Sequence, residues 1–233
     1  MLRATAYTRL TPAIGRLQTL EPTQVAGFNQ FFDDGEGTDA RRYGLGIDQR
    51  FSESLYAGAE ISRRDMDVPY TLLAPPPAPP ESAKADWRED FGRGYLYWTP
   101  HPWLSTSAEV QYEKLERNEE FVGPELFTEI DTWRLPLAVR FFHPSGFFAK
   151  LQSTYVDQEG TFSDPFSGEL TQTGDSFWVV DAALGYRLPK RLGIISLEAG
   201  NLFDEQLNFQ DTDPSHPRIS PERLIAARIT LSF

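Results

Sequence analysis

The side chains best suited to acid–base or metal chemistry near neutral pH are three histidines, His101, His143 and His216. His101 and His143 fall in short turns between predicted strands and His216 falls in the last long loop, so we expect no site that all three share. A zinc site also lacks its ligand set, because the chain has no cysteine. No Gly-x-Ser-x-Gly element is present, and a Ser/His/Asp arrangement is recognised by geometry and not by spacing. The sequence therefore predicts no enzyme, no metal ligand and no cofactor, and we interpret the histidines as turn residues.

Acidic side chains gather in the stretches that we interpret as long loops. They form four groups: Asp33, Asp34, Glu36 and Asp39; Glu116, Glu119, Glu120 and Glu125; Glu169 and Asp175; and Asp204, Glu205, Asp211 and Asp213. Such carboxylates could coordinate calcium or capture a cationic or metal-chelate ligand. No twelve-residue calcium loop is present and loops that face water are commonly acidic, so we interpret the groups as solvated surface. The proline-rich stretch 74–80 is interpreted as a stiff connector, with docking of a partner as the alternative.

Length and composition narrow the class of protein. The chain has 233 residues, 40% of them hydrophobic, and a formal net charge of -12. We expect one domain over residues 1–233 and no nucleic-acid partner, because phosphate binding depends on clustered Lys and Arg. No apolar run approaches the roughly 18 to 20 residues of a membrane-spanning helix. Residues 1–10 lack the pattern of a signal peptide, so we expect a mature form or a C-terminal fragment of an exported protein.

Alternation of apolar and polar residues predicts ten strands. Their predicted bounds are Leu2–Leu10, Arg41–Phe51, Leu55–Arg64, Phe91–Thr99, Trp103–Lys114, Trp133–Phe142, Phe147–Gln158, Phe177–Leu188, Gly193–Phe203 and Arg223–Phe233. Short turns and long loops alternate between them, so all the short turns lie on one edge of an antiparallel meander. This asymmetry is typical of membrane barrels with short periplasmic turns and long extracellular loops. We therefore predict an all-β, antiparallel up-and-down transmembrane β-barrel of about ten strands, which we expect to be part of a larger barrel.

Charged residues are sorted to one face of these strands. In the first strand Arg3 and Arg9 share one parity, whereas Leu2 and Ala4 share the other. The candidates for a polar lumen are Arg134, Arg140, Lys150, Asp181, Arg187, Glu198 and Arg228. An ionised side chain in hydrocarbon costs a few kcal/mol at the midplane, so membrane insertion explains the sorting. The inward charges could line a solute path, or they could form a paired network that holds the wall together.

Aromatic residues on the apolar faces recur eight positions apart. The pairs are Tyr43 and Phe51, Trp133 and Phe141, Phe147 and Tyr155, and Trp178 and Tyr186. At about 3.3 Å per residue and a tilt near 40°, eight residues cross roughly 20 Å, close to the apolar band of about 25 Å between two aromatic girdles. A soluble β-sandwich would also alternate but has no reason to keep this interval. We therefore expect an integral protein of the bacterial outer membrane that contacts lipid.

The C-terminal residues carry a recognisable pattern. It consists of Asn201, Leu202, Phe203 and Asp204 near the end of the penultimate predicted strand, of residues 221–223 at the start of the last strand, and of an alternating close that ends on the aromatic Phe233. Together they resemble the C-terminus of TonB-dependent receptors of the bacterial outer membrane. A terminal aromatic residue is also the pattern that outer-membrane barrels present to their assembly machinery, which implies that machinery as a partner.

The resemblance implies a barrel of 22 strands filled by an N-terminal plug. No plug is expected in this chain, so an energy-coupling protein would act through a plug that lies outside it. The implied function is ligand binding and transport across the outer membrane. A barrel whose soluble N-terminal part is missing and a self-contained ten-stranded barrel stay open.

An alternative function comes from residues 20–34, which are similar to barrels associated with tetratricopeptide-containing outer-membrane proteins. That similarity implies a structural or secretion barrel that anchors a soluble periplasmic repeat domain. An omptin-like barrel enzyme is disfavoured, because no catalytic cluster is visible at the loop edge.

Overall fold

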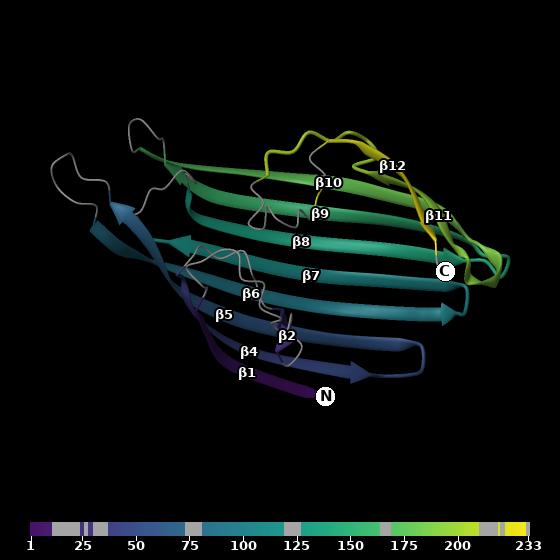
Figure 1. Ribbon diagram of the computed structural model, residues 1–233, viewed down its shortest axis with the longest axis horizontal. Coiled ribbons are helices and arrows are strands. Elements are labelled where there is room, and N and C mark those ends of the chain that lie inside the picture. Colours follow the sequence, from purple (N-terminus) through teal and green to yellow (C-terminus); the bar gives the residue numbers. More distant parts are fainter. Residues whose placement is uncertain are drawn as a thin grey trace.

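The computed structural model describes residues 1–10, 24–25, 28–29, 37–72, 81–118, 127–163, 169–209, 219 and 222–231. Ten strands form one antiparallel sheet in chain order (Figure 1). They are β1 (Leu2–Leu10), β4 (Asp39–Arg50), β5 (Leu55–Leu72), β6 (Glu81–His101), β7 (Leu104–Arg117), β8 (Phe127–Phe142), β9 (Phe147–Ser163), β10 (Leu170–Arg187), β11 (Gly193–Gly200) and β12 (Leu224–Leu231). A 3-10 turn, η1 (Pro189–Arg191), joins β10 to β11, and a separate hairpin is formed by β2 (Gln24–Val25) and β3 (Phe28–Asn29). The predicted all-β, up-and-down fold with ten antiparallel strands is confirmed.

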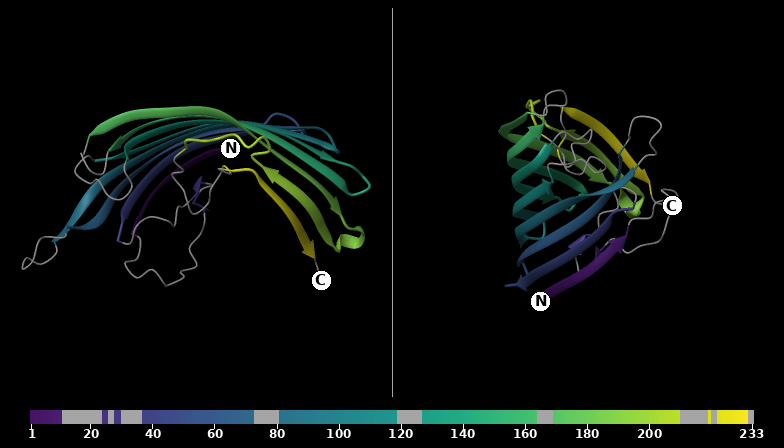
Figure 2. Two further views of the ribbon diagram at one scale, coloured as in Figure 1. Left: turned by 90° about the horizontal axis from the view of Figure 1, so that it is seen from above. Right: turned by 90° about the vertical axis from the view of Figure 1, so that its left-hand side faces the viewer.

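The sheet is curved but not closed. Within the described residues β1 and β12 are its two edges, and neither pairs with the other. Figure 2 shows the strands as an arch, with the β2–β3 hairpin on the concave side. The ten strands therefore form a curved wall that does not close on itself, because their curvature does not bring the two edge strands together. The arch defines a convex and a concave face.

Most strands reach further toward the long-loop edge than predicted. β5 continues past Arg64 to Leu72, and β6 begins at Glu81 instead of Phe91. In the β5 and β6 extensions several inward side chains are apolar and several outward side chains are charged, for example Met66 and Asp67. A strand predicted from a single apolar parity therefore ends too early. β11 is shorter than predicted and ends at Gly200. Residues 232–233 of the last predicted strand lie outside the described part of the chain.

Buried apolar side chains form two clusters on the concave face. The first consists of Ala40, Met66, Val68, Leu115, Phe127 and Ile130, with Trp87 and Phe162 packed against it. The second consists of Val156, Phe177, Val179 and Ile219, with Leu207 and Phe209 packed against it. Leu207, Phe209 and Ile219 lie between β11 and β12 in the chain, and these three residues pack over β9 and β10.

The β2–β3 hairpin is anchored to the concave face by one aromatic ring. Phe28 is 2% exposed. A Cβ placed on Gly44 would approach the Phe28 ring to 2.8 Å, so the glycine leaves the space that the ring occupies. The Arg3 guanidinium lies 5.1 Å from the centre of the same ring, a cation–π distance.

Candidate functional site

The convex face carries an apolar belt in the middle of the strands. Large apolar side chains of this belt are well exposed, for example Leu45 at 56%, Ile61 at 63%, Leu151 at 54% and Ile229 at 66%. Soluble monomers rarely expose contiguous apolar patches of more than a few hundred Å². The belt is therefore suited to an apolar contact outside the sheet.

Aromatic side chains border the belt on both sides. On the long-loop side the Tyr112 and Trp133 rings lie 4.8 Å apart, and the Tyr155 and Trp178 rings lie 5.1 Å apart. On the short-turn side lie Phe51, Trp98, Trp103, Phe141, Phe147 and Tyr186. Each predicted eight-residue pair contributes one member to each row. The two rows therefore mark both limits of the belt.

In β5 to β8 the apolar side of the strands changes from the convex to the concave face at the long-loop aromatic row. The outward residues of β5 are first Leu55, Ala57, Ala59 and Ile61, and then Arg63, Asp65 and Asp67. Its inward residues change in the opposite sense, from Glu60, Ser62 and Arg64 to Met66 and Val68. A strand in one uniform medium keeps its apolar residues on one face. The reversal therefore requires the surroundings of the sheet to change along the strand.

Strands β7 and β8 show the same reversal in register with each other. The outward residues of β7 are Leu104, Thr106, Ala108, Val110 and Tyr112, and then Lys114 and Glu116. Opposite them in β8 lie Phe141, Val139, Leu137, Leu135 and Trp133, and then Asp131 and Glu129. The boundary thus crosses neighbouring strands at a common level and is a property of the sheet, not of one segment.

Beyond this row the convex face of β5 to β8 is covered by charged residues. The Lys114 Nζ atom lies 2.5 Å from Glu129 Oε1 and 3.1 Å from Glu116 Oε1. The hydrogen bond to Glu129 raises the pKa of the Lys114 ammonium, and the same bond lowers the pKa of the Glu129 carboxyl. The Arg63 guanidinium donates two hydrogen bonds of 2.7 and 2.9 Å to Asp90. This part of the convex face is suited to contact with water.

The concave face between β1 and β7 holds a continuous ion-pair network. Arg3 bridges Asp48 at 2.6 Å and Glu60 at 3.3 Å. Arg93 in turn bridges Glu60 at 3.7 Å and Glu109 at 2.9 Å. Each carboxylate of this group holds a cation of a neighbouring strand, so the network braces the wall.

Tyrosine hydroxyls complete the same network, which sequence analysis did not identify. Tyr95 donates a hydrogen bond to Asp48, and Tyr97 donates one of 2.6 Å to Glu109. The sequence signal for these two tyrosines was their position in the strand, since both alternate with outward Leu96 and Trp98. The alternation indicated an inward side chain but not its partner.

Arg134, a predicted lumen cation, is built into the wall. It is 3% exposed and forms an ion pair with Glu113 on the neighbouring strand β7. Arg64 and Glu89 form a similar pair at 2.6 Å. These two arginines therefore support the paired-network interpretation of the inward charges.

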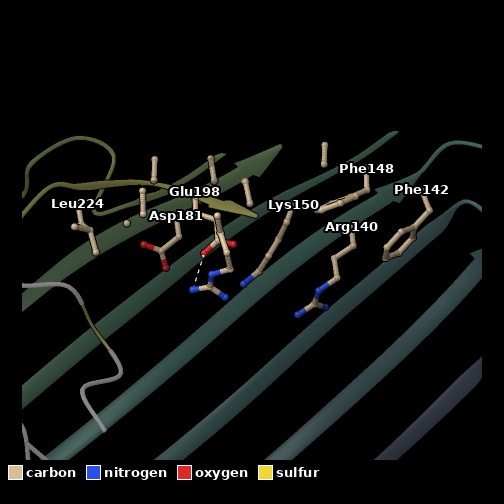
Figure 3. Close-up of a pocket in the computed structure, with 14 residues that line it drawn as sticks. Arg140, Phe142, Phe148, Lys150, Asp181, Glu198 and Leu224 are labelled. Carbon is tan, nitrogen blue, oxygen red and sulfur yellow. Dashed lines mark ion pairs between the residues drawn. The ribbon is translucent and has the colours of Figure 1, made fainter. Parts of the chain in front are cut away.

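A cavity of about 520 Å³ lies on the concave face, where β8 to β12 come together (Figure 3). It brings together five of the predicted lumen residues, Arg140, Lys150, Asp181, Glu198 and Arg228. Register explains this, because residues far apart in sequence become cross-strand neighbours in an antiparallel sheet. Of the other two candidates, Arg134 is buried in its own ion pair and Arg187 is exposed and does not line the cavity.

The carboxylates of this cavity have partners, whereas two of its cations are poorly satisfied. Asp181 accepts the Asn201 N–H at 3.0 Å, and Glu198 lies 3.5 Å from Arg228. Lys150 has no hydrogen bond or ion pair with any residue that the structure describes. The Arg140 guanidinium reaches the Ser107 hydroxyl at 3.4 Å. The cavity therefore offers positive charge to an incoming group.

The Asn201–Asp204 motif forms the turn by which the chain leaves β11. Asn201 is fully buried and has a φ of 44°. Its side chain donates a hydrogen bond of 2.8 Å to the Glu205 carbonyl and accepts one of 2.9 Å from the Glu205 N–H. The Asp204 carboxylate accepts the N–H of Arg223 at 3.0 Å, directly before β12. The motif therefore fixes the end of β11 and the start of β12.

The other residues of the C-terminal pattern have different positions. Leu202 donates its N–H to the Val180 carbonyl at 2.8 Å, which holds the turn against β10. Phe203 is 72% exposed. Phe233 lies outside the described residues.

Replacing Asn201 by Gly is expected to lower the free energy of unfolding by about 2 kcal/mol, because two buried hydrogen bonds of about 1 kcal/mol each are lost. Asn201→Ala is expected to cost about 1 kcal/mol more, since alanine is strained at positive φ. Denaturant unfolding of the folded protein measures both. Asn208→Ala is the matched control, because the Asn208 side chain is exposed and makes no hydrogen bond within the described residues. Equal losses for Asn208→Ala and Asn201→Gly would contradict the assignment.

The described histidines lie at the short turns, where the sequence placed them. The His101 ring stacks on Trp103 with centroids 5.0 Å apart, and His143 shares a hydrogen bond of 2.8 Å with Ser145. His216 and the stretch 74–80 lie outside the described residues. Within the described ranges no three His, Asp or Glu side chains are grouped closely enough to hold a metal ion. The same residues form no helix with the length and apolar character needed to cross a membrane.

Comparisons with known proteins find no relative of this chain. No protein-family model matches it, and neither a curated protein nor a solved structure matches it.

Proposed function

We propose that this chain is the wall of an integral β-barrel of the bacterial outer membrane, with the convex belt in contact with lipid acyl chains. The reversal of the apolar face carries the proposal. Between the aromatic rows, hydrocarbon outside and water inside favour apolar side chains outward and ionised side chains inward. Beyond the long-loop row, water outside and packed protein inside favour the opposite arrangement.

Strand length is consistent with this position. About 9 to 11 tilted residues are enough to cross a bilayer. β5 has 18 residues and β6 has 21, so both exceed that need. The surplus lies on the long-loop side of the aromatic row and projects from the membrane under this proposal.

The open edges belong to a larger barrel in this proposal. In lipid, unpaired N–H and C=O groups along a strand edge each cost several kcal/mol, so only closed barrels are stable. We place further strands beside β1 and β12 on this ground. The C-terminal strand is also the element that the assembly machinery would recognise.

Ligand binding and transport, as in a TonB-dependent receptor, is the function that we assign to this barrel. The cavity with two poorly satisfied cations supports it, as does the resemblance of Asn201–Asp204 and its surroundings. Outer loops would meet the ligand, the concave face would pass it, and an energy-coupling protein would act through a plug.

The second candidate is a structural or secretion barrel that anchors a soluble periplasmic repeat domain. The packing of Phe28 and Ile219 on the concave face favours it, because protein there occupies space that a conduit would need. Limited proteolysis of the full-length product in membranes separates the two functions. A receptor keeps its plug inside the barrel, whereas an anchor releases a soluble repeat domain.

Cell fractionation with a heat-modifiability gel tests the membrane location. The full-length product is expected in the outer-membrane fraction, to resist extraction by urea, and to migrate faster unheated than boiled, because a closed barrel stays folded in detergent. A periplasmic soluble β-protein is the matched control and is expected in the soluble fraction. Recovery of the product in the soluble fraction would overturn the proposal.

A further inference from the structure

We propose that the cavity between β8 and β12 binds an anionic ligand that has an aromatic or apolar part, such as an aromatic carboxylate. This inference rests on the proposed function, because it names the ligand class of the same concave face. Arg140 and Lys150 would bind the negative charge of the ligand, and Phe142 and Phe148 would contact its apolar part.

Arg140 and Lys150 form a like-charge pair across two strands. They are direct register partners in β8 and β9. Figure 3 shows both side chains projecting into the cavity from neighbouring strands. Like charges directly opposite each other destabilise a sheet. A bound anion between them would convert this repulsion into two charge-assisted hydrogen bonds.

The rest of the cavity does not supply that anion. Glu198 already accepts a hydrogen bond of 2.9 Å from Ser196 and faces Arg228, while Asp181 holds the Asn201 turn. Elsewhere on the concave face, Arg3, Arg64, Arg93 and Arg134 all form ion pairs with carboxylates. In a chain of net charge -12, two adjacent cations without a carboxylate therefore indicate a site for an external anion.

The apolar wall of the cavity indicates that the anionic ligand also has an aromatic or apolar part. Phe142 and Phe148 are register partners two residues along their strands from Arg140 and Lys150, and so lie on the same face. Gly185 gives the Phe148 ring room to lie across β10, because a Cβ there would collide with it. Small residues, Ala183 and Ala226, also line the cavity. The cavity volume of about 520 Å³ lies within the range of small-molecule sites, roughly 300 to 1,000 Å³.

Isothermal titration of the folded full chain in detergent micelles tests the site with 2-naphthoate, and 2-naphthylmethylammonium serves as the probe of opposite charge. The carboxylate is expected to bind and the ammonium is not. Lys150→Met is expected to weaken naphthoate binding at least about tenfold, because a hydrogen bond to a charged group is lost. Lys150→Arg is expected to retain binding. Arg187→Met is the matched control, because it removes the same charge outside the cavity, and its affinity is expected to equal that of the unchanged protein.

Three outcomes would overturn the anion site: no naphthoate binding to the folded protein, equal binding of both probes, or equal weakening by Arg187→Met and Lys150→Met. A product that is heat-modifiable and membrane-bound but does not bind naphthoate refutes the anion site and leaves the barrel proposal intact. A soluble product whose naphthoate binding depends on Lys150 refutes the barrel and supports the site.

Discussion

Replacing Leu137 by Arg is expected to destabilise the protein in a lipid bilayer by about 2–4 kcal/mol, because an arginine at the midplane of a barrel leaves water for hydrocarbon. Leu137 is the middle outward residue of β8 between Trp133 and Phe141, and it is 47% exposed. In a protein whose convex face meets water, the same change would alter stability by no more than about 0.5 kcal/mol. Equilibrium unfolding from lipid vesicles measures the difference.

Leu170→Arg is the matched control for this experiment. Leu170 is 46% exposed and has the same outward parity, but it lies eight residues beyond Trp178 on the long-loop side. We expect this change to cost about 0.5 kcal/mol or less. If Leu137→Arg and Leu170→Arg were equally tolerated, the belt would not contact lipid and the proposed location would be wrong.

Replacing Glu113 by Ala is expected to cost about 3–5 kcal/mol of unfolding free energy, because it removes the carboxylate that forms an ion pair with the buried Arg134 guanidinium. The two side chains are 10% and 4% exposed. Glu113→Gln keeps an acceptor for Arg134 and is expected to cost less than the alanine change. Denaturant titration of the folded protein measures both variants.

An exposed ion pair of the same sheet provides the control. The Lys84 ammonium lies 3.9 Å from Asp67, and the side chains are 64% and 43% exposed. Asp67→Ala is expected to cost less than about 1 kcal/mol, because water screens and solvates both groups. A loss for Glu113→Ala as small as that for Asp67→Ala would show that water reaches Arg134 and that the wall is not braced there.

Several features of the fold could be predicted because alternation along a strand needs no knowledge of other strands. β1 has the predicted bounds, Leu2 to Leu10, and its side chains alternate between exposed and half-buried as expected. The outward parity of Tyr43 and Ile61 and the short turns were predicted on the same ground. Five of the seven candidate lumen residues meet in one cavity, since their parity was assigned correctly.

The extensions of the strands could not be predicted from a single apolar parity. Met66 and Val68 continue β5, but their apolar side chains face the concave side, opposite to Ile61. The predicted strand ended at Arg64 because a single apolar parity assumes that the same medium surrounds the sheet along the whole strand. The Asn201–Asp204 motif was identified by resemblance and placed near the end of a predicted strand. Its turn and the hydrogen bond from Asn201 to Asp181 were missed, because Asn201 and Asp181 meet only when β10 and β11 are in register.

The order of residues is sufficient to settle which face each side chain takes, because successive residues of a strand point to opposite sides. It does not settle which charges neutralise each other, because that depends on the register of different strands. Arg134 has Glu113 within reach on the neighbouring strand β7, whereas the register partner of Lys150 in β8 is another cation, Arg140. Curvature is likewise a property of the assembled sheet, and it leaves β1 and β12 as separate edges. The register of the folded sheet thus decides which inward charges form ion pairs that brace the wall and which line the cationic cavity.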